Sequence, residues 1–260
     1  MSGVGKAARM SLGTILSVWA HPDDETYLAG GVMAAAIDRG ERVVCVTATA
    51  GERGTPDPRV WPPGRLGQRR RWEAAAAMAV LGVADHRFLG LPDGALVDHE
   101  SEGRVAVGAL LDEVRPDTIL TFGPDGMTYH PDHIAVSRWV TDAWRGRGSR
   151  CRLLYATFTA EHLSRFGELY EEWDAYMSDE RPSGVPADEL DLHVRLRGSP
   201  LDRKLTALEA MASQTRDIIA AIGQPTYAAL VDEEAFVDAA HVVPSAHSQA
   251  MPSLSLPSRP

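Results

Sequence analysis

Residues 14–40, TILSVWAHPDDETYLAGGVMAAAIDRG, decide how this chain folds. The segment 14–20 is apolar or β-branched almost throughout, which is typical of a central strand covered on both faces. Residues 26–39 carry small and apolar side chains at helical spacing, and Gly40 follows where a helix would end. A histidine, a proline and three carboxylates lie between them, so the stretch predicts a strand, an acidic turn and a helix.

The same alternation continues along the next hundred or so residues. Strands are expected at 42–48, 86–89 and 117–122, and helices at 66–81, 105–114 and 131–144. Strands separated by helices lie parallel and are joined by right-handed crossovers. The sequence therefore predicts an α/β fold: a Rossmann-like, doubly wound, mostly parallel sheet with helices on both faces.

The pattern is less regular after residue 150. A fifth strand is expected at 153–158, followed by a strand at 192–196 and a helix at 201–222. Residues 168–191 hold nine acids with Arg181 as their only base, which predicts a solvated, flexible insertion. We expect one domain over residues 1–243 with its core at 14–158, and a disordered tail over the Ser- and Pro-rich residues 244–260.

Composition excludes several classes of function. With 260 residues, 44% of them hydrophobic, the chain can bury one substantial core. Its net charge of -10 repels phosphate backbones, so nucleic acid is not an expected partner. Cys45 and Cys151 supply neither a disulfide framework nor a thiolate metal cluster, which fits a reducing compartment. Without a secretion signal or an apolar span, we expect a cytoplasmic protein with no membrane insertion.

Polar clusters follow four of the predicted strands. They are HPDDE at 21–25, GERGT at 51–55, LPDG at 91–94 and GPDGMTYHPDH at 123–133. In open parallel sheets, ligands bind outside the carboxyl ends of the strands. These four loops should therefore converge on one rim of the sheet.

A metal site is the chemistry that this rim suggests. His21 and Asp24 are three residues apart at the start of a helix and can aim at one point, and His133 from the fourth loop can join them. Two histidines and one carboxylate leave a coordination position open to water, as in catalytic zinc sites. The cation and the positive end of the helix would also offset the repulsion between neighbouring carboxylates.

Simpler interpretations exist for each cluster alone. Asp23 or Asp24 can cap the helix, a role that aspartate often fills. His130 and His133, with Asp132, can be the polar start of the next helix, because a lone HxxH pattern is weak evidence. Two His/Asp clusters at the same edge of one sheet favour the metal site.

The set AHPDDE, GERGT, LGLPDG and HPDH, in this order, resembles the PIG-L (LmbE-like) family of zinc-dependent N-deacetylases. These enzymes remove acetyl or related acyl groups from N-acylated amino sugars. The resemblance covers residues 14 to about 158, and it places the family's metal ligands on His21, Asp24 and His133. It implies a Zn²⁺ cofactor, with Fe²⁺ or another divalent ion as alternatives, and a small amino-sugar substrate.

The resemblance also implies catalytic roles for three further residues. Asp23 would be the general base, and His130 would stabilise the developing oxyanion or protonate the leaving amine. Asp132 would orient His130 and favour its cationic form by Coulomb attraction. Amide hydrolysis needs these functions because water is a poor nucleophile at neutral pH until a metal lowers its pKa.

Two positions depart from the family pattern. Tyr129 stands where many relatives have a glycine before the second histidine motif, so the rim there is bulkier and carries a hydroxyl. Met211 stands where relatives often have a histidine, so no role is carried over from the helix around it.

Substrate contacts are expected from four side chains of the rim. Arg53 can hydrogen-bond sugar hydroxyls or a phosphate, and Glu52 can either anchor its own loop or bind a sugar hydroxyl. Tyr129 can add its hydroxyl, and Trp61 in the loop PRVWPPG can form a sugar platform. Asp93 in LPDG is expected to be a turn residue, since Pro-Asp-Gly is a strong turn signal. The arginines at 69–71 are expected to be solvated charges or partners of Glu73.

Several functions stay open at this level. Non-haem iron(II) oxygenases also use two histidines and one carboxylate, but with tighter spacing on a β-rich scaffold, and Asp23 would then be idle. A nucleotide-binding module is disfavoured, because carboxylates in the first turn repel a pyrophosphate. A metal-binding protein without catalysis is the third class. Within the deacetylase interpretation, two related activities share these motifs: an amidase of thiol-sugar conjugates and a deacylase of a glycosylated natural product. The motifs do not separate either activity from an N-acetylglucosamine deacetylase. Assembly into a homo-oligomer is left open.

Overall fold

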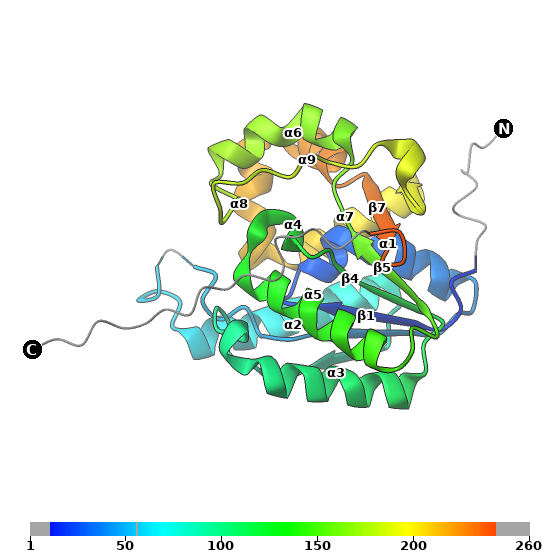
Figure 1. Cartoon of the computed structure of the whole chain (residues 1–260). Helices are drawn as coiled ribbons and strands as arrows, with labels where there is room; N and C mark the ends of the chain where they lie inside the picture. Colours follow the sequence, from blue (N-terminus) through cyan, green and yellow to red (C-terminus); the bar gives the residue numbers. More distant parts are fainter. Residues whose placement is uncertain (1–10, 56, 243–260) are drawn as a thin grey trace, which may run out of the picture.

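The computed structural model describes residues 11–55 and 57–242 and contains one seven-stranded sheet (Figure 1). The strand order is β3-β2-β1-β4-β5-β7-β6. The first five strands are parallel, and β7 lies antiparallel between β5 and β6. The strands are Ile15–Trp19 (β1), Val43–Thr47 (β2), Asp85–Phe88 (β3), Thr118–Phe122 (β4), Arg152–Ala156 (β5), Leu192–Arg195 (β6) and Glu233–Asp238 (β7). The predicted α/β fold is confirmed.

Helices cover both faces of the sheet. Helices α1, α2 and α7 pack together on one face, and α3 and α5 pack together on the other (Figure 1). The helices are Asp24–Asp38 (α1), Pro63–Leu81 (α2), Glu100–Val114 (α3), Gly126–Tyr129 (α4), Pro131–Gly146 (α5), Ala160–Glu172 (α6), Ser199–Ala210 (α7), Ala212–Ile222 (α8) and Gln224–Leu230 (α9). Gly40 follows α1 with a φ of 79°, as expected of the glycine after a helix.

The central strands are buried along their whole length, which explains their continuous apolar sequences. Every residue of β1, β2 and β4 is buried. At the carboxyl ends of β1 and β4, the rings of Trp19 and Phe122 meet edge to face with centroids 4.9 Å apart. This contact fixes the ends of the two strands directly beneath the loops that follow them.

The connectivity places a crevice between these two strands. From β1 the chain moves outward through β2 to β3, and it then returns to β4 on the other side of β1. Ligands in open α/β sheets bind where the strand order reverses in this way. The HPDDE turn and the loop at 123–133 therefore border the expected ligand crevice.

The C-terminal part contains more structure than the sequence predicted. Helices α6 and α9 and strand β7 were not predicted, and the helix expected at 201–222 is broken at Met211. The insertion expected at 168–191 begins inside α6, and its Tyr176 is buried. The tail predicted at 244–260 lies outside the described residues.

Within the described ranges, no helix is both long and apolar enough to cross a bilayer. Cys45 and Cys151 are both free thiols, as the sequence predicted.

Candidate active site

The turn between β1 and α1 has an unusual backbone at Asp23. This residue has a φ of 122°, which non-glycine residues adopt only under constraint. Its carbonyl oxygen accepts the backbone N–H groups of Thr26 and Tyr27, both at 2.9 Å, and so begins the helix. Its side chain makes no capping hydrogen bond, and the Asp24 carboxylate instead accepts the His21 N–H at 2.8 Å. The helix-capping interpretation therefore does not describe what these two carboxylates do.

His21, Asp24 and His133 come together as expected, with ligand atoms facing one another. His21 Nδ1 lies 3.2 Å from His133 Nε2 and 3.5 Å from Asp24 Oδ2, and His133 Nε2 lies 3.5 Å from the other oxygen, Asp24 Oδ1. Tetrahedral coordination with bonds of about 2.0–2.1 Å holds neighbouring ligand atoms about 3.3–3.4 Å apart. The three side chains therefore fit a small divalent cation in both chemistry and spacing.

The far nitrogens of both rings are fixed by hydrogen bonds. His133 Nδ1 donates to the carbonyl oxygen of Gly126 at 3.0 Å, which leaves Nε2 with its lone pair directed at His21. A side chain at residue 126 would place its Cβ 2.9 Å from that of His133, so this close approach requires a glycine. His21 Nε2 lies 3.3 Å from Asp132 Oδ2 and 3.2 Å from Asp93 Oδ1. Such outer contacts orient metal-ligating histidines in proteins.

Spacing allows two further groups to hold an ion: His21 with His130 and His133, and His21 with Asp93 and Asp132. The two carboxylates in the latter group are already used by the backbone. Asp132 accepts the N–H groups of Gly94 at 2.7 Å and Leu96 at 3.0 Å, and Asp93 accepts that of Arg53 at 2.7 Å. The Asp93 and Asp132 carboxylates are therefore better placed to orient the His21 ring than to bind the ion. Asp93, expected to be only a turn residue, is 6% exposed and belongs to the site.

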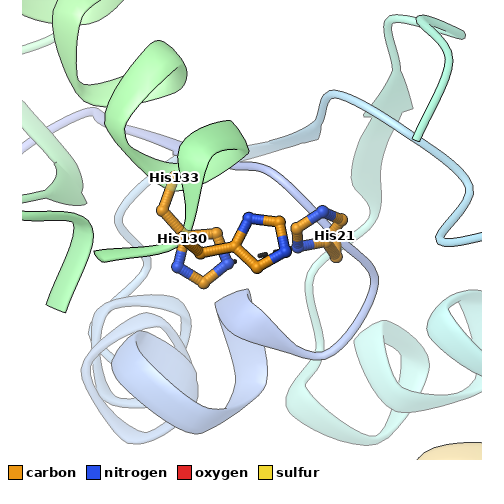
Figure 2. A group of neighbouring side chains, drawn as sticks. All are labelled: His21, His130 and His133. Carbon is orange, nitrogen blue, oxygen red and sulfur yellow. Dashed lines mark hydrogen bonds between the residues drawn. The ribbon is translucent and has the colours of Figure 1, made fainter. Parts of the chain in front are cut away.

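His130 joins the cluster from the residue before α5 (Figure 2). Its ring stacks on that of His133, with centroids 4.7 Å apart, and meets the His21 ring edge-on at 4.8 Å. Asp132 meets this ring through its backbone N–H, which donates to His130 Nδ1 at 3.1 Å, while its carboxylate faces His21. The charge of Asp132 acts to raise the pKa of His130, in the direction expected. Burial and the His21 charge lower the pKa of His130, so the resting ring is neutral rather than cationic.

The electrostatics of the cluster favour a bound positive charge. Burial opposes protonation of His21, yet hydrogen bonds with Asp132, Asp24 and Asp93 raise its pKa well above the usual value. Burial lowers the pKa of His133 to about 4, which keeps its lone pair available. Burial and the neighbouring Asp24 charge raise the pKa of Asp23 to about 7, the range in which a general base works at neutral pH.

Comparison with known proteins assigns the family. Residues 16–144 match the family model described as PIG-L, GlcNAc-PI de-N-acetylase. The 1D-myo-inositol 2-acetamido-2-deoxy-alpha-D-glucopyranoside deacetylase of Saccharomonospora viridis is 38% identical over 200 residues, which cover 67% of this chain and 72% of that enzyme. The chain belongs to the PIG-L family.

Solved structures agree with the fold of this PIG-L chain. The N,N'-diacetylchitobiose deacetylase of Pyrococcus horikoshii superposes with a TM-score of 0.60 at 20% identity, covering 91% of this chain and 90% of that one. The 4-carboxy-2-hydroxymuconate hydratase of Pseudomonas putida gives 0.59 at 19% identity, covering 90% and 98%. One fold thus carries a deacetylase and a hydratase, so the reaction must be argued from the site.

The PIG-L site contains a buried arginine that the sequence did not predict. Arg70 is 8% exposed, and its guanidinium donates to the carbonyl oxygen of Gly54 at 2.8 Å. Its charge acts against the raised pKa of Asp23. The expectation of a solvated charge is wrong for this arginine. Arg70 follows the buried Leu66 by one helical turn and precedes the buried Ala74 by another, so helical periodicity was the signal for it.

A cavity of about 370 Å³ opens beside the cluster and is lined by Asp23, Asp24 and His133. None of the four side chains expected to contact substrate lines it. Glu52 accepts the Asp93 N–H at 2.9 Å and so anchors the loop, which is one of the two roles considered for it. Trp61 lies beneath the guanidinium groups of Arg65 and Arg69. Sugar contacts by Arg53, Glu52, Tyr129 and Trp61 stay predictions.

Proposed function

We propose that this chain is a metal-dependent N-deacetylase that hydrolyses the acetamide group of an N-acetylglucosamine-type amino-sugar derivative. The family and its inositol-glycoside deacetylase relative support the reaction class. The observation that carries the proposal is the facing arrangement of His21 Nδ1, His133 Nε2 and the Asp24 carboxylate beside Asp23.

His21, Asp24 and His133 would hold the cation, for which we propose Zn²⁺. Two neutral imidazoles and one carboxylate suit this ion, with Fe²⁺ as the alternative for the same donor set. When bound, the ion polarises the acyl oxygen and lowers the pKa of water.

Asp23 is the proposed general base. Its carboxylate lies next to the ligand set and lines the cavity, and a neighbouring cation would favour its ionised form, which accepts a proton. Water adds to the acyl carbon as Asp23 takes its proton, which gives a tetrahedral intermediate with a negatively charged oxygen.

His130 is the proposed donor to that intermediate. Because its Nδ1 accepts the Asp132 N–H, the neutral ring carries its proton on Nε2. This N–H stabilises the oxygen by hydrogen bonding and stays on His130. The proton that Asp23 took from the water passes to the nitrogen as the C–N bond breaks, so the products are the free amine and acetic acid, which ionises to acetate. Asp132 acts through its backbone on His130 and through its carboxylate on His21.

The reaction is tested by metal analysis and acetate release. Zinc-loaded protein should release acetate from a 2-acetamido-2-deoxyglucopyranoside of myo-inositol, and we also include N-acetylglucosamine and N,N'-diacetylchitobiose. Asp23→Asn should keep the metal and lose at least about 100-fold in kcat. Asp24→Ala should lose the metal itself. If zinc-loaded protein released no acetate from any of the three compounds, the proposed reaction would be wrong.

A thiol-sugar conjugate added to this panel separates the remaining functions. Amine release from a thiol-sugar conjugate without acetate release would assign an amidase instead. Metal binding without turnover on any compound would favour the non-catalytic alternative. A cytoplasmic location stays a prediction.

A further inference from the structure

The cavity beside the ligand cluster is walled mainly by apolar side chains. It lies between the rim of the sheet and the C-terminal helices α6, α8 and α9, which the sequence did not lead us to connect with the site. Its apolar walls include Leu28, Phe158, Trp173, Ile218, Leu230 and Val231.

Four of the polar side chains in the wall are paired with protein partners. Each makes a short hydrogen bond or ion pair, which reduces its capacity to bind a ligand hydroxyl. The pairs are Tyr27 with Tyr227 at 2.7 Å, Tyr170 with His162 at 2.8 Å, Glu234 with Lys204 at 2.7 Å and Glu233 with Thr159 at 2.6 Å. The wall therefore favours an apolar ligand group, because a hydroxyl that finds no partner loses its hydrogen bonds to water.

The polar part of the site lies elsewhere. His130, Asp93 and Arg70 surround the cluster but do not line the cavity. A scissile amide carries a hydroxyl-rich sugar on its nitrogen and an acyl chain on its carbon. The sugar hydroxyls need hydrogen-bond partners, so we place the sugar on this polar side. The acyl chain then extends past Asp23, Asp24 and His133 into the cavity.

The volume exceeds what an acetyl group needs. The cavity has a volume of about 370 Å³, on a measure by which a single water molecule needs only about 10–15 Å³. We propose that this cavity is an acyl-chain subsite and that the protein accepts N-acyl amino sugars with chains of about six to eight carbons. The inference rests on the proposed deacylase function and names a substrate class that extends beyond N-acetyl compounds.

Binding distinguishes this proposal from the reaction itself. Zinc-loaded Asp23→Asn protein is titrated calorimetrically with N-acetylglucosamine and with N-hexanoylglucosamine, which share the sugar and differ by four methylenes. A fully buried methylene contributes about 0.8 kcal/mol, or about fourfold in affinity, so we expect the hexanoyl compound to bind at least about tenfold tighter. Equal or weaker binding of the hexanoyl compound would overturn the subsite. If Asp23→Asn binds the hexanoyl compound more tightly but the unsubstituted, zinc-loaded protein releases no acyl group, only the proposed reaction is refuted.

A matched pair of variants on α8 locates the chain. Ile218 lines the cavity and its neighbour Ile219 does not, although both pack against the core. Ile218→Ala should reduce the preference for the hexanoyl compound by at least about threefold, whereas Ile219→Ala should leave it unchanged. An unchanged preference in Ile218→Ala, or equal losses in both variants, would overturn the assignment of the chain to this cavity.

Discussion

The buried carboxyl group of Glu25 has a specific task next to Asp23. It is 0% exposed, and its two oxygens accept the Asp23 N–H at 3.2 and 3.3 Å. Residue 23 is held at a φ of 122°, a conformation that typically costs about 1–3 kcal/mol. Burial raises the pKa of Glu25 to about 8, so this group is neutral at pH 7 and acts as a hydrogen-bond acceptor without needing a counterion. We infer that Glu25 is a positioning residue for the proposed general base.

Two substitutions of Glu25 test this role. Glu25→Gln keeps a carbonyl acceptor of the same size and should retain kcat within about threefold. Glu25→Met fills a similar volume without an acceptor and should lower kcat by about 10- to 100-fold, the range found for residues that orient catalytic groups. KM and zinc content should change little in both. Normal kcat in Glu25→Met would show that Asp23 does not depend on this hydrogen bond.

At the scale of single residues, the sequence predicted identities better than contacts. His21, Asp24 and His133 were predictable because each follows a buried strand, and they meet as expected. The partner of the Asp132 carboxylate was not predictable, because a carboxylate that lies near three histidine rings can bond to any one of them. Asp93 was missed because a Pro-Asp-Gly turn looks the same whether or not its carboxylate is needed elsewhere.

Among the elements, α7 and β7 are joined to α1 by a completely buried ion pair. Lys204 Nζ lies 2.7 Å from Glu234 Oε1 and 2.7 Å from the carbonyl oxygen of Tyr27. The Glu234 carboxylate also accepts the backbone N–H groups of Gly31 and Val32, both at 2.7 Å. This pairing explains why β7 was not predicted. Its sequence EEAFVD begins with two glutamates, which is typical of an exposed segment. In the structure, Lys204, which lies 30 residues earlier in the chain, neutralises Glu234.

Removing one partner of this pair should destabilise the fold strongly. Lys204→Met leaves the Glu234 charge buried without its counterion, and such changes cost about 3–5 kcal/mol. The double variant Lys204→Met, Glu234→Gln removes both charges and should recover part of that loss. Free energies of unfolding from urea titration measure both. A loss below about 1 kcal/mol in Lys204→Met would show that the pair contributes little.

For the whole molecule, topology accounts for the site. His21 and His133 are separated by 112 positions, yet they meet because β1 and β4 are neighbours at the point where the strand order reverses. The parallel half was predictable, since its strands are continuous apolar runs between helices. In the C-terminal half, the strand at 192–196 and the helical stretch at 201–222 were predicted, whereas α6, α9 and β7 were not. The cavity that α6, α8 and α9 close has no signature in local sequence.

Binding of the cation should stabilise the whole fold. The proposed ligands come from the β1–α1 turn and from the start of α5, so the ion would bind the folded chain and not the unfolded one. At one hundred times the dissociation constant, such binding adds about 2.7 kcal/mol, which corresponds to a rise in Tm of about 5–10 °C for a domain of this size. Zinc added to chelator-treated protein should produce this rise in calorimetry.

Two aspartates decide which group of side chains holds the ion. Asp24→Ala should abolish the rise in Tm, whereas the exposed Asp98 provides the matched control, and Asp98→Ala should retain it in full. Asp93→Asn keeps its hydrogen-bonding shape beside His21, so it should weaken zinc binding by about 10- to 100-fold without abolishing it. A full rise in Asp24→Ala, together with none in Asp93→Asn, would instead place the ion between His21, Asp93 and Asp132. His21 would then bind through Nε2 rather than Nδ1, and Asp23 would no longer adjoin the reacting carbon.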